Sequence, residues 1–188
     1  MSNRTQIVCL HEGKAGRSVD PVFINRLMRS LKPAWIRRWG GSNIVRLEGC
    51  GGRMALIEAV PKRLQEILDA GGNTTLMVWA DLDHDMADGD ALKSVFWRQA
   101  KQQGITHPQF DQVVFVFAKD RIENWIQFLS TGATDESQEG PRLPDDKQAA
   151  TAARLLADHC LRGAAIPNVP PSLEWSCRNW RALVERMR

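Results

Sequence analysis

Two uninterrupted apolar runs constrain the fold of this chain more than any other feature of its sequence. They cover residues 76–80 (LMVWA) and 113–117 (VVFVF). A short strand that carries no polar residue is typical of a parallel sheet, where helices cover both faces of each central strand. The two runs therefore indicate a parallel sheet with buried strands at its centre.

Segments with the apolar spacing of amphipathic helices alternate with strand-like segments along the first 130 residues. In chain order we expect a strand at 6–10, a helix at 20–32, a strand at 43–47, a helix at 53–69, the strand at 76–80, a helix at 91–103, the strand at 113–117 and a helix at 121–129. Asp20 is the expected N-cap of the first helix, because Pro21 occupies its first turn. The alternation predicts an α/β fold with a mostly parallel, four-stranded central sheet flanked by helices.

The composition of the chain changes after residue 130. Residues 130–146 (STGATDESQEGPRLPDD) are polar and contain Gly and Pro, which is typical of a surface loop. An Ala-rich helix and a final amphipathic helix follow. We therefore expect an α/β domain at 1–130, a flexible loop at 131–146 and a helical extension at 147–188 that packs on the same domain. A length of 188 residues suits one domain.

The charge and hydropathy of the chain limit the kinds of partner it can bind and the cellular compartment we expect for it. The chain carries 25 Lys and Arg against 22 Asp and Glu, a net charge of +3, which permits an anionic partner without requiring one. No apolar stretch approaches the roughly 20 residues of a membrane span, and the N-terminus lacks the pattern of a signal peptide. The four cysteines form no C-x-x-C pair, so we expect them to be neutral thiols. Together these features lead us to expect a cytoplasmic protein that binds no membrane.

Charged residues gather where three of the predicted strands end. They are Glu12 after the first strand, Asp81, Asp83 and Asp85 after the third, and Lys119, Asp120 and Glu123 after the fourth. Ligands of open parallel sheets bind beyond these carboxyl ends. Residues two apart on an extended chain point the same way, so Asp81 and Asp83 can address one point. Oxygen ligands in this arrangement suit Mg²⁺ or Mn²⁺, whereas the alternative is a solvated acidic loop.

Three motifs in this order resemble the Toprim fold family, the catalytic core of topoisomerases, bacterial primases, recombination factors and OLD-type nucleases. They are HEG at 11–13, GCGG at 49–52 and DLDHD at 81–85. The run RIENW at 121–125 is similar to an E-x-W element of small Toprim-like proteins, some of which are linked to bacterial defence. The resemblance covers residues 5 to 130, and it implies a Toprim-like Rossmannoid fold.

The resemblance also implies a Mg²⁺-dependent phosphoryl-transfer enzyme, a nuclease that cleaves phosphodiester bonds of nucleic acid. Glu12 would be the general acid and base, or a metal contact through water. Asp81 and Asp83 would hold one or two Mg²⁺ or Mn²⁺ ions, and Asp85 would join them if the loop turns back. A metal of this kind polarises the phosphoryl oxygen and lowers the pKa of a bound water.

Other charged residues have two interpretations each. Lys14 and Arg17 contact a substrate phosphate or are solvated loop residues, and Lys119 is a further phosphate-binding candidate. Glu123 is an additional site acid or a first-turn carboxylate that the helix dipole favours. Many Toprim relatives have an acidic residue two or three positions after the EG pair. Here six residues separate Gly13 from the next acid, Asp20, and its expected N-cap role already explains Asp20.

The resemblance implies nucleic acid as a partner, DNA rather than RNA. It also implies a separate ATPase, because small Toprim proteins of this kind resemble effector subunits that act beside one, and this sequence has no Walker A motif of its own. Such a subunit would act in anti-phage defence. Exposed tryptophans on the terminal helix would favour an oligomer. Trp35 and Trp39 beside two arginines either stack bases or form an amphipathic edge strand.

Two alternatives to the nuclease remain open at this stage. In the first, the chain is a non-catalytic Toprim-like binding or regulatory subunit, which its low net charge favours. In the second, it is a phosphohydrolase of the haloacid dehalogenase type, although the DxD of that family lies on the first strand and here it follows the third.

Overall fold

The computed structural model describes residues 6–13, 20–31, 45–71, 74–142, 146–162 and 166–187. Its centre is a sheet of four parallel strands in the order β2-β1-β3-β4. The strands are β1 (Gln6–His11), β2 (Val45–Gly49), β3 (Thr74–Leu82) and β4 (Val114–Lys119). The predicted α/β fold with a four-stranded central sheet is therefore confirmed, and the sheet is parallel throughout.

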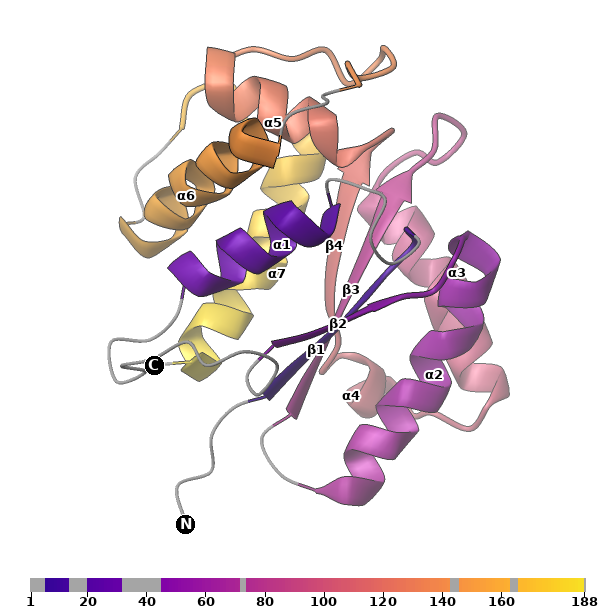
Figure 1. The fold of residues 1–188 in the computed structure, drawn as a ribbon. Helices are drawn as coiled ribbons and strands as arrows, with labels where there is room; N and C mark the ends of the chain where they lie inside the picture. Colours follow the sequence, from indigo (N-terminus) through magenta and orange to yellow (C-terminus); the bar gives the residue numbers. More distant parts are fainter. Residues whose placement is uncertain are drawn as a thin grey trace.

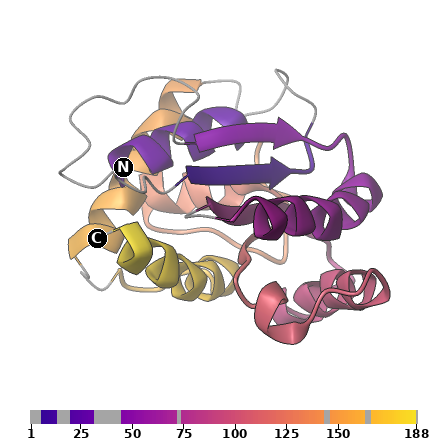
Figure 2. The same cartoon turned by 90° about the horizontal axis from the view of Figure 1, so that it is seen from below.

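Helices cover both faces of this sheet. They are α1 (Asp20–Ser30), α2 (Arg53–Ala70), α3 (Gly89–Gln102), α4 (His107–Phe110), α5 (Ile122–Thr131), α6 (Asp146–Arg162) and α7 (Pro171–Met187). Figure 1 shows α2, α3 and α4 on one side of the strands and α1, α5, α6 and α7 on the other. In Figure 2 the same layers are seen from below, with β1 and β2 between α1 and α2. The strands are apolar because helices exclude water from both of their faces.

The strand order creates a switch point between β1 and β3. The chain passes from β1 to β2 on one side and then crosses back over β1 to β3 and β4. Because such crossovers are right-handed, the reversal places α1 on one face and α2 and α3 on the other. The chain therefore leaves the carboxyl ends of β1 and β3 toward opposite faces of the sheet, which leaves room for a site between the two strand ends.

Two hydrophobic cores lie on the two faces of the sheet. The core under α1 holds a cluster of aromatic rings in which Trp79 contacts Phe23, Trp125 and Trp180, with ring centroids 5.5–6.2 Å apart. The core under α2 and α3 contains Phe96 and the alternate residues of β4. These contacts place three of the seven tryptophans inside the first core. Trp175 and Trp180 of the terminal helix are both buried, so neither is the exposed tryptophan that would favour an oligomer.

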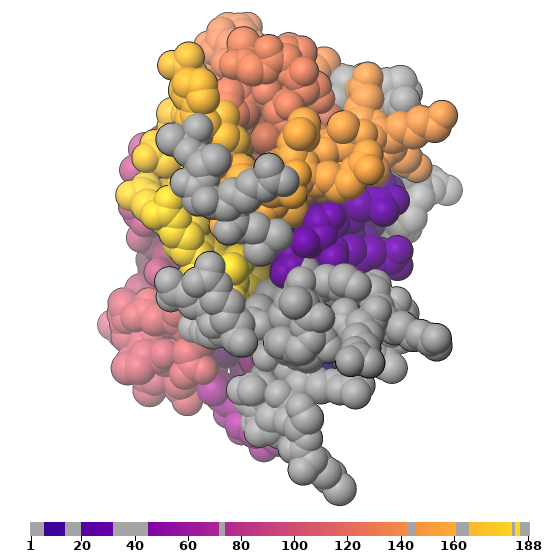
Figure 3. All heavy atoms as spheres, turned by 90° about the vertical axis from the view of Figure 1, so that its left-hand side faces the viewer, coloured from indigo at the N-terminus to yellow at the C-terminus, as the bar shows by residue number. Residues whose placement is uncertain are grey.

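The C-terminal helices pack on the α/β unit, which agrees with the predicted helical extension. Helix α6 lies against α1 and α5, and α7 lies along β4. Figure 3 shows α5, α6, α7 and α1 side by side over this face. Ser172 at the start of α7 ties the layers together, because its hydroxyl accepts hydrogen bonds from the Trp125 indole at 2.8 Å and from the Lys119 backbone at 3.1 Å.

The segment after α5, predicted to be a flexible loop, has several defined contacts. The backbone amide of Gly140 donates to Asp120 Oδ2 at 2.9 Å, and the amide of Ser172 donates to Glu136 Oε2 at 3.1 Å. Glu139 pairs with Arg121. These bonds hold the described part of the segment, up to residue 142, against α5 and α7 without a helix or strand of its own.

Several element boundaries differ from the expected ones. Strand β3 continues to Leu82, so Asp81 belongs to the strand, and β2 ends at Gly49, two residues beyond its expected end. The short helix α4 was not expected; Thr106 and Gln109 form its capping box. Trp35 and Trp39 lie outside the described residues.

Two further expectations concern the membrane and the thiols. No helix in the described parts of the chain combines the length and the apolar composition that crossing a membrane requires. All four cysteines are free thiols. Burial raises the pKa of the Cys9 thiol, which keeps it neutral.

A close contact at the start of α3 makes one residue critical for packing. A Cβ atom added at Gly89 would lie 2.4–2.7 Å from three ring atoms of Trp175. We expect Gly89→Ala to destabilise the protein by about 1–3 kcal/mol, although Ala is the better helix former. The measurement is Tm. In a protein that already carries Trp175→Leu, adding Gly89→Ala should no longer lower Tm. A stabilised Gly89→Ala protein would contradict this packing.

Candidate active site

A cavity of about 260 Å³ opens at the switch point, at the carboxyl ends of β1 and β3. Its described walls are His11, Glu12, Gly13, Asp20, Gly52, Trp79, Ala80, Asp81, Ala118 and Ile122. The wall combines apolar residues of the sheet with carboxyl groups from separate elements. This is the position at which open parallel sheets bind ligands.

Four acidic residues from four elements meet at or beside this cavity. Glu12 follows β1, Asp20 begins α1, Asp81 lies near the end of β3, and Glu123 is in the first turn of α5. The backbone amide of Asp81 donates to Glu12 Oε1 at 3.2 Å, so the two predicted site residues are in direct contact. The parallel register, with His11 opposite Trp79, produces this contact.

Arg53 is the centre of the ionic contacts. Its Nε donates to Glu12 Oε1 at 3.0 Å, one terminal nitrogen pairs with the Asp83 carboxylate, and the other donates to the backbone oxygen of Asp81. Arg53 begins α2 directly after Gly52, which has φ 136°. A backbone of this conformation favours glycine, and it turns the chain so that Arg53 reaches both strand ends.

Burial and neighbouring negative charges raise the pKa values of the acidic residues at the site. Burial raises the pKa of Asp81 well above its ordinary value, and the nearby carboxyl groups of Asp20, Glu12 and Glu123 raise it further. Burial also raises the pKa of Glu12, although the ion pair with Arg53 opposes this. The pKa of Glu123 is raised, again chiefly by burial. The cluster therefore favours a bound proton or cation.

The remaining predicted acids lie nearer the solvent. The side chain of Asp83 is 59% exposed and pairs with Arg53. Asp85 is exposed on the turn after β3 and is not among the described residues that line the cavity. His84 points toward Asp120, with Nε2 and Oδ1 3.7 Å apart. Of the acids in DLDHD, Asp81 alone lines the cavity among the described residues.

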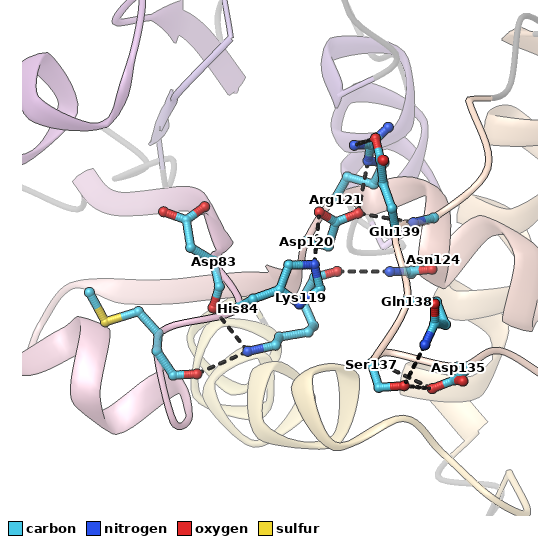
Figure 4. A network of polar contacts seen from close by, with 12 residues as sticks. Asp83, His84, Lys119, Asp120, Arg121, Asn124, Asp135, Ser137, Gln138 and Glu139 are labelled. Atoms are coloured by element: carbon cyan, nitrogen blue, oxygen red, sulfur yellow. Dashed lines mark hydrogen bonds and ion pairs between the residues drawn. The ribbon is translucent and has the colours of Figure 1, made fainter.

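Lys119 holds the loop that follows β3. Figure 4 shows its Nζ donating to the backbone oxygen of Asp83, at 2.9 Å, and the same nitrogen donates to the backbone oxygen of Met86 at 2.9 Å. Asn124 in turn donates to the Lys119 backbone oxygen at 3.0 Å. The amine thus fixes the chain next to Asp83, and its predicted contact with a substrate phosphate stays a prediction.

Three outcomes of the site prediction concern other residues. Lys14 and Arg17 lie outside the described residues. Asp20, which the sequence explained as an N-cap, lines the cavity and raises the pKa of Asp81, so it belongs to the site. The sequence did not single out Arg53; its position directly after the GCGG turn was the available signal.

The donor chemistry of the site fits a divalent cation. Glu12, Asp81 and Asp83 offer only oxygen ligands, which Mg²⁺ and Mn²⁺ prefer. No cationic side chain among the described residues pairs with the Asp81 carboxylate, while Glu12 and Asp83 are paired with Arg53. Among the described residues, no three acidic, His or Cys side chains are arranged to hold an ion together.

Comparison of the chain with protein-family models, with curated proteins and with solved structures found no match. We therefore argue the function from the position of the cavity, the chemistry of its walls and the order of the sequence motifs.

The raised pKa of Asp81 makes a prediction about stability and pH. The unfolded chain ionises Asp81 at a lower pH than the folded protein, so stability falls as pH rises from the ordinary Asp range through the raised value. We expect Asp81→Asn to be more stable than the wild type near about pH 7.5 and nearly equal to it near about pH 4.

The experiment measures Tm across this range with a chelator present. Each 1 kcal/mol of stabilisation should raise Tm by about 2–4 °C in a chain of this size. Asp85→Asn, an exposed acid of the same loop, is the control and should change little. A destabilised Asp81→Asn protein at neutral pH would contradict the electrostatic account.

Proposed function

We propose that this chain is a Toprim-like, Mg²⁺- or Mn²⁺-dependent nuclease that cleaves phosphodiester bonds of nucleic acid. One observation carries the proposal: Glu12 and Asp81, from motifs far apart in sequence, lie in contact at one cavity at the switch point of a parallel sheet. The order HEG, GCGG, DLDHD supplies the resemblance, and the fold supports it.

In the proposed reaction, Asp81, Glu12 and Asp83 are the residues that would hold the ion. When bound, the ion polarises the phosphoryl oxygen and lowers the pKa of water. Glu12 accepts or donates the proton of the attacking or leaving oxygen, because its burial keeps its pKa above that of an ordinary carboxylate. The walls formed by Trp79 and Ile122 exclude bulk water from this side of the site.

Arg53 orients the reacting carboxylate in this proposal. Its Nε bond to Glu12 fixes one carboxylate oxygen, and its two terminal nitrogens brace the end of β3. The guanidinium also balances the charge of Glu12 and Asp83 before substrate binds. Arg53 is thus a positioning residue rather than a group that reacts.

The proposed partners follow from what the chain carries. The proposed substrate is nucleic acid, with DNA favoured over RNA, and the proposed partner is a separate ATPase, which the resemblance to small Toprim-like effector subunits supports. The proposed setting is cytoplasmic anti-phage defence. Lys119 and Arg53 are described cations at the strand ends that can approach a phosphate.

A nuclease assay tests the proposal directly. Plasmid, single-stranded DNA and RNA are incubated with the protein and Mg²⁺ or Mn²⁺, with a chelator as the blank. We expect Glu12→Gln and Asp81→Asn to lose cleavage by about 10²- to 10⁴-fold, the usual contribution of an acid–base group. Asp85→Asn should retain activity, since Asp85 lies outside the cavity wall. Cleavage that survives in both site variants would overturn the assignment.

A second candidate function has one observation in its favour. Because Arg53 already pairs with Glu12 and Asp83, the guanidinium can take the place of a metal ion, as expected of a binding or regulatory module without catalysis. In that case Arg53→Gln, which frees both carboxylates, should bind Mn²⁺ at least about tenfold more tightly than the wild type.

Calorimetric titration with Mn²⁺ separates the two candidates. Arg63→Gln is the matched control, because Arg63 pairs with Glu48 and Glu66 away from the cavity. Tight Mn²⁺ binding by the wild type, unchanged by Arg53→Gln, would contradict the second candidate. Weak binding that improves in Arg53→Gln alone would favour it over the nuclease.

A further inference from the structure

Two ring nitrogens at the candidate site are buried and have no hydrogen-bond partner among the described residues. They are His11 Nδ1 and Trp79 Nε1, on residues that are 2% and 5% exposed. His11 and Trp79 are neighbours in the register of β1 and β3, and both line the cavity. A buried polar group without a partner costs free energy, so a ligand that pairs with these nitrogens would be stabilised there.

The size of the cavity limits what this ligand is. Its volume of about 260 Å³ is several times the roughly 30 Å³ that a water molecule occupies. It falls just below the roughly 300–1,000 Å³ of sites that enclose a drug-sized molecule. A single planar ring system therefore fits, while a whole nucleotide extends beyond it.

The chemistry of the wall limits the ligand further. The described wall carries the carboxyl groups of Glu12, Asp20 and Asp81 and no Lys or Arg, so it favours N–H donors over a phosphate. The Trp79 indole N–H is a donor only and requires an acceptor. Ala118 and Ile122 supply apolar surface for the faces of a ring. A ligand for this wall therefore presents N–H groups and a ring acceptor on one rigid frame.

We propose that the cavity binds a nucleobase that carries an exocyclic amino group. The amino N–H groups face the Asp20 carboxylate, a ring nitrogen or carbonyl oxygen accepts from Trp79 Nε1, and His11 Nδ1 pairs with a further edge position. Guanine, adenine and cytosine each combine an amino donor with an acceptor, whereas uracil and thymine lack the amino group. The choice of a nucleobase rests on the proposed nuclease function.

In this arrangement an unstacked base enters the cavity while its phosphate stays at the strand ends. Enzymes that hold a base outside the stack read it through its edge and through apolar contacts with its faces. The cavity then selects which nucleotide lies next to the cleaved bond. The source of the base is a nucleic-acid strand or a free nucleoside, and the chemistry of the wall is the same for both.

The test measures binding without catalysis. Wild-type protein is titrated with guanosine, adenosine, cytidine and uridine, and with short single strands of each base, in a chelator that removes divalent ions. We expect at least one amino-bearing base to bind and uridine to bind more weakly. Preference for the strand over the nucleoside identifies nucleic acid as the source, and equal affinity identifies the free nucleoside.

Matched variants locate the binding in this cavity. Trp79→Phe removes the N–H and keeps a ring, and it should weaken binding by about two- to tenfold, the worth of one neutral hydrogen bond. Trp180→Phe is its control, because Trp180 Nε1 is also buried without a partner but Trp180 does not line the described wall. Asp20→Asn, outside the core, should abolish the preference for amino-bearing bases if Trp79→Phe fails to fold.

Binding of no base, uridine binding as tight as the others, or equal loss in Trp79→Phe and Trp180→Phe would overturn the proposal. Because metal is absent, these outcomes do not depend on cleavage. If the protein binds amino-bearing bases but cleaves no nucleic acid, this inference holds and the proposed nuclease function is wrong. If it cleaves nucleic acid but binds no base, only this inference is wrong.

Discussion

Strands β1 and β3 pair in parallel with His11 opposite Trp79, and this register brings the Glu12 carboxylate to the backbone amide of Asp81. The contact depends on the reversal of strand order, because the crossover from β2 to β3 returns the chain past β1. Parallel strands end at the same edge of a sheet, so their terminal acids converge even though many residues separate them. The cavity, the ionic contacts of Arg53 and the raised pKa of Asp81 all follow from this pairing.

The convergence of acids has a cost that the surrounding elements reduce only in part. Arg53 pairs with the carboxylates of Glu12 and Asp83, whereas it only partly offsets the effect of burial and of Asp20, Glu12 and Glu123 on Asp81. Buried acidic residues that repel one another and have raised pKa values are common where a protein binds a proton, a metal ion or a polar ligand. Such residues are retained for function although they lower the stability of the fold. The site thus has an ion-paired side around Arg53 and a carboxyl-lined cavity, and the two meet at Glu12, which pairs with Arg53 and also lines the cavity.

Much of the fold was predictable from local sequence. The apolar runs that became β3 and β4 carry no polar residue over five positions, which a strand covered on both faces requires. Glu12 and Asp81 were predictable site residues because they stand at strand ends. Asp20 and Arg53 were not, since an acid in a first helical turn and an arginine at a helix start have ordinary local explanations. Their part in the site depends on which elements lie across the cavity.

The sequence by itself determined the parallel α/β fold and the acids at its strand ends, because burial on both faces and strand–helix alternation are local patterns that any register preserves. The tertiary structure decided which charges meet. Arg53 reaches Glu12 and Asp83 only because the Gly51–Gly52 turn aims the start of α2 at the ends of two strands. Packing buries the rings of His11 and Trp79 beside the same cavity, where one nitrogen of each has no hydrogen-bond partner in the part of the chain that the structure describes. Such contacts join residues far apart in the chain, and spacing along the sequence does not encode them.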